Sequence, residues 1–394
     1  MANHRIYIDH NATTPVAPEV ADAMIPYLTE IYGNASSVHS LGQEARAAVE
    51  KARGQVAGLI GVRAKEITFT SGGTEADNLA IHGIVGASDK KKKHIITTTI
   101  EHSAVLQTCR ALETEGARAT YVPVNGQGVV DPEEIRKAIT PDTVLISVMQ
   151  ANNELGTVQP IAEIANIARE HKVPFHTDAV QAAGKIPVSV EELGVDLLSL
   201  SAHKIYGPKG VGALWIRGAL PIKPLIFGGK DQRARRPGTE NVAGIVGFGA
   251  AAELVRLSLE EEGKRLSALR DRLEQEILER VPYAAVSGRE AVRTPNTSNI
   301  YFDFVEGEAL VIALDLKGIA CSTGAACSSG AVEPSHVLTA IGLPLERARA
   351  SMRFSLGRLT TEEAIDQIVE TLPGAVEQLR ALSPRYKKEA TAAS

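Results

Sequence analysis

The sequence contains few cysteines, with three in 394 residues. A small and odd number of cysteines in a long chain argues against a disulfide framework and is typical of proteins from a reducing compartment. The sequence also lacks an apolar run long enough to span a bilayer. Its start, MANHRIYIDH, has no apolar segment of the kind found in signal peptides. We therefore expect a cytoplasmic protein without a membrane partner.

An excess of positive charge is also missing. The formal net charge is -5 and the sequence pI is about 6.1, whereas surfaces that bind nucleic acid are typically basic. The only dense basic run, residues 90–93, precedes an expected strand and is interpreted as a solvated loop. We expect no direct nucleic-acid partner. The length and the 44% hydrophobic content are enough for two or three domains with sizeable cores.

Residues 67–217 alternate short β-branched runs with amphipathic helical stretches. Strands that alternate with helices of this length predict an α/β domain with a mostly parallel sheet and helices on both faces. The predicted strands are ITFTS, HIITTTI, ATYVPV, VLISVM, VPFHTDAV, VDLLSLSA and VGALWI.

The C-terminal third follows a different pattern. A long charged helix is predicted over about residues 246–280 and a second helix near residues 307–316, and the last helix starts at residue 361. The strands TSNIYFDF and SMRFSLG lie between these helices. This order predicts a smaller α+β domain packed on the first. We expect a large domain over residues 13–255 and a small domain formed by residues 1–12 and 256–394.

The stretch CSTGAACSSGA, residues 321–331, contains nothing larger than threonine but holds two of the three cysteines. Without large apolar side chains such a run cannot anchor itself in a core, so it predicts a mobile surface loop over about residues 321–334.

Several reactive side chains follow the predicted strands, and ligands of open parallel sheets bind beyond the carboxyl ends of the strands. In FTSGGTEADN, two glycines and a helix start at Thr74 predict either a phosphate cradle or a tight turn capped by Thr74. Asp178 ends a mostly apolar strand, where a carboxylate either needs a cationic partner or caps a helix.

Lys204 directly follows a buried strand and precedes a Gly-Pro turn. A half-buried lysine at a sheet edge has a lowered pKa and can act as an amine nucleophile, although a snorkelling lysine is the alternative. His102 opens a helix at the same edge of the sheet. A phosphate cradle, an aspartate and a lysine placed together describe a site for pyridoxal phosphate.

The motifs SGGTEADN, EHSAVL, ANNELGTVQPI, HTDAVQAAGK, SAHKIYGPKGVGAL, RPGTEN and CSSG…PSHVL occur in this order. With them the sequence resembles the cysteine desulfurases, pyridoxal phosphate enzymes of the aspartate-aminotransferase fold (fold type I), and in particular the group that acts with iron–sulfur scaffold proteins. The resemblance implies conversion of L-cysteine to L-alanine, with a persulfide that is passed to an acceptor protein for iron–sulfur cluster assembly or tRNA thiolation. It implies no resident metal ion.

The resemblance also implies a role for each site residue. Lys204 would attach the cofactor and remove the substrate's α-proton, and His102 would stack on the cofactor ring and shuttle protons. Cys327 would be the nucleophile that carries the persulfide, and a transient iron–sulfur ligand at most. Asp178 would contact the ring nitrogen, and Gln181 the phenolic oxygen, with Asn153 close by. Asn34 and Arg353 would bind the substrate carboxylate. The phosphate would be held by Gly73, Thr74, Ser201, His203 and, from the other subunit of a homodimer, Thr239.

The sequence departs from the family pattern at two places. Residues 230–232, KDQ, are unusual at what would be the dimer edge, and Cys321 stands where a small apolar residue is commoner. The alternatives for Cys321 are a resolving thiol and a cluster ligand, but we expect it, like the mid-helix Cys109, to pack as a small core residue. A selenocysteine lyase would use much the same residues, whereas an aminotransferase of the same fold would not need the cysteine loop. A binding protein without turnover is disfavoured by the intact reactive residues.

Overall fold

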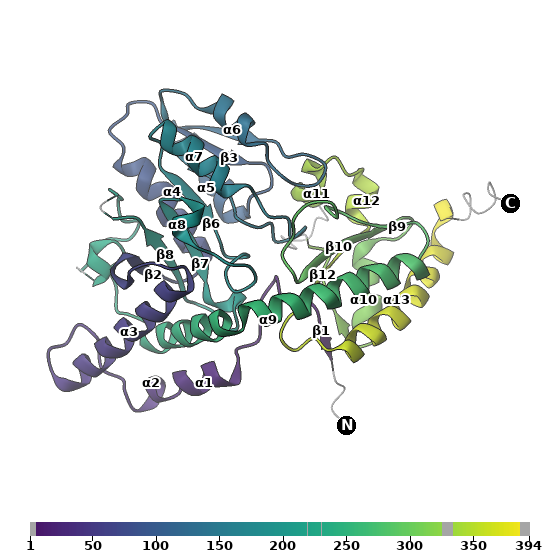
Figure 1. Ribbon diagram of the computed structural model, residues 1–394, viewed down its shortest axis with the longest axis horizontal. Helices are drawn as coiled ribbons and strands as arrows, with labels where there is room; N and C mark the ends of the chain where they lie inside the picture. The colour runs from purple at the N-terminus through teal and green to yellow at the C-terminus, as the bar shows by residue number, and fades with distance from the viewer. Residues whose placement is uncertain (1–4, 219, 230, 325–333, 387–394) are drawn as a thin grey trace.

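The structure is a computed structural model that describes residues 5–218, 220–229, 231–324 and 334–386 (Figure 1). A seven-stranded sheet of order β2-β8-β7-β6-β5-β3-β4 forms its centre. Only β8 runs antiparallel to its neighbours in this sheet, so the predicted mostly parallel α/β sheet is confirmed. The strands are β2 Ile67–Thr70, β3 His94–Thr98, β4 Arg118–Val122, β5 Thr143–Ser147, β6 Phe175–Asp178, β7 Leu197–Ser201 and β8 Gly212–Ile216.

Helices cover both faces of the sheet, because neighbouring strand residues point to opposite sides. Ile95 packs in one apolar cluster with α4 (Gly73–Ala87) and α5 (Ser103–Thr114). Ile96 packs in another, with α3 (Ser40–Leu59), α7 (Ile161–Glu170) and the start of α9 (Val242–Arg280). The other helices of this half are α1 Pro18–Met24, α2 Pro26–Thr29, α6 Pro132–Ala138 and α8 Val190–Leu193.

A second, smaller layer follows α9. Its three-stranded antiparallel sheet has the order β12-β10-β9, and the short β1 pairs in parallel with β11. Helices α10 and α13 pack on this layer in a separate apolar cluster. The elements are β1 Ile6–Tyr7, β9 Ala284–Val286, β10 Thr297–Phe302, α10 Gly307–Asp315, β11 Ile319–Ala320, α11 His336–Ala340, α12 Leu345–Arg349, β12 Ser351–Ser355 and α13 Glu362–Leu382.

Helix α9 runs along both halves of the molecule (Figure 1). It begins at Val242, earlier than the predicted residue 246, because the Asn241 side chain caps it by accepting a hydrogen bond from the Gly244 amide at 3.0 Å. Val255 still packs in the first core, whereas Leu266 packs in the second. The predicted domain boundary at 255/256 therefore falls within this helix.

Helix α9 is also long and apolar enough to cross a membrane, which differs from the expectation that no apolar run has this length. Half of its most apolar window is buried inside the molecule, and the start of the helix packs on α3. A core helix passes the same test of length and composition, so this feature is weak evidence for a membrane span.

Candidate active site

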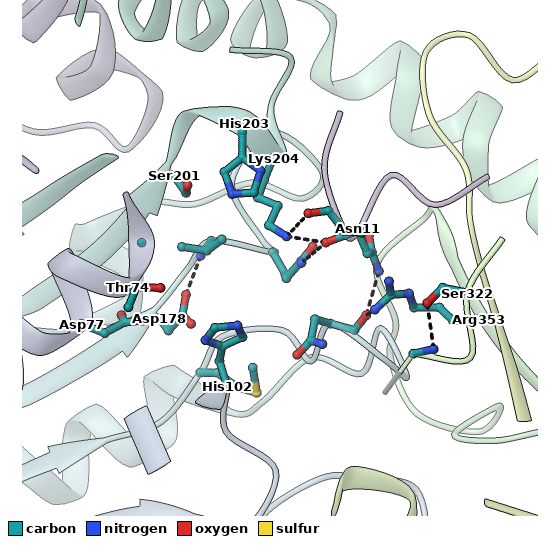
Figure 2. A pocket seen from close by; sticks show the side chains of 17 residues that line it. Asn11, Thr74, Asp77, His102, Asp178, Ser201, His203, Lys204, Ser322 and Arg353 are labelled. Carbon is teal, nitrogen blue, oxygen red and sulfur yellow. Dashed lines mark hydrogen bonds between the residues drawn. The ribbon is translucent and has the colours of Figure 1, made fainter. Parts of the chain in front are cut away.

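A cavity of about 450 Å³ opens where the parallel strands end (Figure 2). The end of the sheet supplies its walls because β6 ends at Asp178 and β7 ends at Ser201. The structure brings ten predicted site residues to this one cavity: Gly73, Thr74, His102, Asn153, Asp178, Gln181, Ser201, His203, Lys204 and Arg353.

Lys204 lies in a 3-10 turn, Ala202–Lys204, directly after β7. Its Nζ donates hydrogen bonds to the backbone oxygens of Asn11, at 2.5 Å, and Ala12, at 2.7 Å. Burial and then the positive charge of Arg353 lower the pKa of Lys204 to about 8. An appreciable fraction of this side chain is thus the neutral amine near neutral pH, which is the form that attacks a carbonyl carbon.

Asp178 and His102 reach the same cavity from two other elements. The Asp178 carboxylate accepts a hydrogen bond from the Val180 amide at 2.9 Å. Burial raises the pKa of Asp178, and the nearby His102 and Lys204 partly offset this rise. Among the described residues Asp178 has no cationic hydrogen-bond partner. Its carboxylate is therefore available to pair with a protonated ring nitrogen.

His102 caps α5, and its Nδ1 accepts a hydrogen bond from the Ala104 amide at 3.1 Å. The proton of the neutral ring is therefore on Nε2. Burial lowers the pKa of His102, so the ring stays neutral at physiological pH. Figure 2 shows His102 and Lys204 on opposite sides of the cavity.

The predicted phosphate cradle lies at the start of α4. The helix begins at Gly73, and its N-cap is Gly72, which has no side chain, so the alternative of a turn capped by Thr74 is wrong. The first amides of a helix have no partner within the helix and bind anions. A Cβ on Gly73 would lie 2.9 Å from Val180 Cγ2. Nearby, the buried Ser201 hydroxyl has no hydrogen-bond partner among the described residues, so the site fits a phosphate group.

Arg353 in β12 faces the cavity from the smaller layer. Its guanidinium donates to the Asp9 carboxylate at 2.7 Å and to the Asn153 carbonyl at 3.1 Å. Its buried Nε has no hydrogen-bond partner among the described residues. The planar fork is suited to binding a carboxylate with two hydrogen bonds.

Two predicted residues, Asn34 and Thr239, do not line this cavity in the single chain. Asn34 is exposed in a turn, where its side chain accepts a hydrogen bond from the Ser36 amide at 2.9 Å. Thr239 is exposed as well. Cys327 lies outside the described residues. Ser322 and Gly324, which precede it in the chain, line the cavity. The roles of Asn34, Thr239 and Cys327 stay predictions.

The two other cysteines are buried, as predicted for each of them, so the prediction that the surface loop starts at residue 321 is wrong. Cys109 and Cys321 both belong to apolar clusters, and burial raises the pKa of each thiol to about 12. At neutral pH these thiols are protonated and therefore poor nucleophiles. Among the described residues no cluster of three or more histidine, cysteine, aspartate or glutamate side chains could hold a metal ion.

The unusual segment 230–232 is tied to the core through its last residue, while Lys230 lies outside the described residues. The Gln232 side-chain oxygen accepts hydrogen bonds from Arg53, at 2.7 Å, and from the Phe69 amide, at 3.2 Å. Gln232 therefore links α3 to the edge strand β2.

Asn11, Asp77 and Lys185 were not predicted from the sequence. Asn11 and Asp77 line the cavity, and Asp77 follows Thr74 at the i, i+3 spacing that puts both on one face of α4. Burial and then Asp178 raise the pKa of Asp77 well above its usual value. The helical spacing could have predicted Asp77, whereas Asn11 reaches the cavity from a distant part of the chain.

Comparison with known proteins gives matches over nearly the whole chain. The model of the aminotransferase class-V family matches residues 6–368. "Cysteine desulfurase IscS" of Dictyoglomus turgidum is 52% identical over 384 residues, 98% of this chain and 97% of that protein. A solved NifS-like protein has a TM-score of 0.89 and 40% identity, and covers 95% of this chain and 99% of its own. SspA, solved in complex with cysteine, has a TM-score of 0.81 and 38% identity, with 89% and 98% covered.

Proposed function

Because the chain belongs to the class-V aminotransferase family, we propose that it is a pyridoxal phosphate-dependent cysteine desulfurase that converts L-cysteine to L-alanine. The family likeness confirms the resemblance seen in the sequence and the predicted fold type. One observation about the site carries the proposal: a lysine with a lowered pKa, a buried aspartate, a phosphate cradle and an arginine line one cavity. These four features are the ones that a pyridoxal phosphate enzyme acting on an amino acid requires.

The described residues divide the work at the amino acid. Arg353 binds the substrate carboxylate, and the neutral Lys204 amine removes the proton from Cα. Bound pyridoxal phosphate supplies a ring that takes up the electron pair released at Cα, and Asp178 is placed to hold the ring nitrogen protonated. His102 Nε2–H is placed to exchange a proton with the substrate sulfur.

Sulfur leaves the substrate by transfer to a second thiol. The Cys327 thiolate attacks the substrate Sγ, so that an S–S bond forms while the Cβ–S bond breaks. The electron pair of the broken bond stays with the carbon, which takes up a proton and becomes the methyl group of alanine. The carbon is thus reduced by two electrons, and the two sulfur atoms that join are oxidised by two. The transferred sulfur remains on Cys327 as a persulfide.

We propose a cytoplasmic homodimer that passes the persulfide sulfur to an acceptor protein, such as an iron–sulfur scaffold. Exposed large apolar side chains support self-association: Val38 is 88% and Phe227 86% exposed in the single chain. Thr239 is exposed as well, so that a partner subunit can contact it.

Product analysis tests the activity. The protein loaded with pyridoxal phosphate is incubated with L-cysteine and a thiol reductant, and we expect alanine and sulfide in equal amounts. Pyruvate as the carbon product would indicate β-elimination, and a sulfur-containing keto acid would indicate transamination. Either product in place of alanine would contradict the proposal.

Replacement of Cys327 by serine tests the nucleophile. We expect Cys327→Ser to lose alanine production by about a hundredfold or more, because a serine hydroxyl cannot take up the sulfur. Cys321→Ser is the matched control and should keep most of the activity, since that thiol is buried and protonated. Mass spectrometry of peptides should find the added sulfur on Cys327. An added sulfur on Cys109 or Cys321 with Cys327 unmodified would refute this assignment.

A further inference from the structure

Lys185 is a partly buried lysine close to the catalytic lysine that has no role in the steps above. It follows Gln181 at the i, i+4 spacing in the turn after β6, where the Ile186 amide donates to the Ala182 carbonyl at 3.0 Å. This spacing puts the Gln181 and Lys185 side chains on the same side of the turn. Gln181 lines the cavity, whereas Lys185 does not and contacts Gln181 through its Nζ.

Lys185 contacts two side-chain oxygens. Its Nζ donates a hydrogen bond to Gln181 Oε1 and another to Asn11 Oδ1, the latter at 2.9 Å. Burial, followed by the charges of Lys204 and Arg353, lowers the pKa of Lys185 well below its usual value. Even the neutral amine has two N–H groups, one for each of these oxygens.

The amide of Gln181 is consequently oriented in one way. A glutamine side chain offers an oxygen acceptor on one side and an NH₂ donor on the other, and nothing in the amide itself decides which faces a ligand. Because the Asn11 carbonyl can only accept, the amide nitrogen faces it, and Oε1 faces Lys185, which donates to it. The amide nitrogen donates to the Asn11 carbonyl at 2.9 Å and keeps a second N–H for a group in the cavity.

We infer that Lys185 is a positioning residue that fixes the Gln181 amide so that it offers an N–H donor, and never its oxygen, to an anionic oxygen of the cofactor. The inference rests on the proposed function, because it takes pyridoxal phosphate to be the group in the cavity and Gln181 to face its phenolic oxygen. It deepens that function by identifying a residue that acts on the cofactor through another side chain.

The Asn11 contacts extend the same network to Lys204. The Asn11 carbonyl accepts hydrogen bonds from both Gln181 and Lys204, and the Asn11 side-chain oxygen accepts from Lys185 and from Asn296, at 3.1 Å. Lys185 thus holds the side chain of the residue whose backbone anchors the catalytic amine. A networked contact of this kind is expected to show coupling in a double-mutant cycle.

The test is a double-mutant cycle read out on cofactor binding. Apoproteins of wild type, Lys185→Met, Gln181→Ala and the double variant are titrated with pyridoxal phosphate. Methionine keeps the length of the side chain but has no N–H donor. We expect Lys185→Met to weaken binding about tenfold and to shift the visible absorption maximum of the bound cofactor. In the Gln181→Ala background the same substitution should have little further effect on either quantity.

Two further variants separate positioning from folding. Lys185→Arg keeps the donors and should restore most of the affinity and the absorption maximum, since a cavity of about 20 Å³ beside Lys185 offers room for the larger head group. Gln181→Glu keeps a partner for Lys185 but replaces the N–H donor by an oxygen, and should weaken binding even in the presence of Lys185. Lys51→Met, at an exposed lysine of α3, is the matched control and should change neither quantity.

The outcomes distinguish a failure of the proposed function from a failure of the role of Lys185. Wild-type protein that binds no pyridoxal phosphate would overturn the proposed function. Wild-type binding with an unchanged Lys185→Met variant would overturn the role of Lys185 alone. If Lys185→Met weakened cofactor binding by the same factor in the wild-type and Gln181→Ala backgrounds, this would also overturn the role, because Lys185 would then act independently of Gln181. If Lys185→Met fails to fold, Lys185→Arg decides: an affinity and an absorption maximum near those of wild type would support the role of Lys185, and the loss of both although the donors are kept would overturn it.

Discussion

At the scale of single residues, the site depends on cations held close to one another. Burial and then the charge of Arg353 lower the pKa of Lys204, and burial followed by the charges of Lys204 and Arg353 lowers the pKa of Lys185. Such a cluster destabilises the charged form of a lysine, which is useful where a neutral amine has to act near neutral pH. Asp9 and Asp178 partly offset it by raising the pKa of Lys204.

This electrostatic arrangement predicts a pH profile. The rate at which the apoprotein attaches pyridoxal phosphate covalently should rise with pH with a midpoint near the Lys204 pKa of about 8, because only the neutral amine reacts. Arg353→Met removes a charge that lowers this pKa and frees Asp9, which raises it, so the midpoint should move to higher pH. The rate is measured from the growth of the visible absorption band.

Two variants serve as controls for this profile. Lys204→Ala should form no covalent adduct that borohydride can trap. Arg347→Met, which removes a partly exposed arginine paired with Asp303, should leave the midpoint unchanged. A wild-type midpoint near 10.5, the ordinary value for lysine, would show that the environment does not lower the pKa.

At the scale of elements, β-branched runs predicted all seven strands of the large sheet, and the helices between them followed from apolar periodicity. Reactive residues at strand ends were predictable for the same reason, since parallel strands bring their carboxyl ends together. The antiparallel direction of β8 and the contacts of Asn11 were not, because both depend on pairing between distant segments. The Lys185 contact with Gln181 was also missed, although its i, i+4 spacing is local.

The start of α4 gives a prediction at this scale. Gly73→Ala should weaken pyridoxal phosphate binding about tenfold, since the new Cβ would lie 2.9 Å from Val180 Cγ2 and force the cradle to shift. Binding is measured by titration of the apoprotein. The matched control is Gly54→Ala on the exposed face of α3, where a Cβ meets nothing within 4 Å.

Gly54→Ala should leave cofactor affinity unchanged and raise the free energy of unfolding by about 0.5–1 kcal/mol, because alanine has the higher helix propensity. Equal cofactor affinities for Gly73→Ala and Gly54→Ala would argue against a cradle at the start of α4.

At the scale of the whole molecule, the site joins the two layers. Lys204 and Asp178 come from the large sheet, whereas Arg353 comes from β12 of the smaller one. Helix α9 packs in both cores and so fixes the position of one layer relative to the other. A substrate bound between Lys204 and Arg353 therefore depends on the relative position of the layers as well as on either layer alone.

The proposed dimer predicts that two inactive variants restore each other. Lys204→Ala removes the catalytic amine, and Thr239→Glu places a negative charge where the phosphate would be repelled. If Thr239 acts in the partner's site, a mixed dimer has one site in which both residues are native. Random mixing then gives about half mixed dimers, and about a quarter of all sites should be intact.

The measurement is alanine production after the two variants are unfolded and refolded together, compared with each variant refolded alone. We expect activity near a quarter of that of wild type refolded in the same way, because each mixed dimer contributes one intact site. If Thr239 instead served the site of its own chain, one site of the mixed dimer would lack the lysine and the other would carry the glutamate, so no activity would return. Sedimentation of the refolded mixture establishes that dimers have formed, and dimers without restored activity would contradict the assignment of Thr239 to the partner's site.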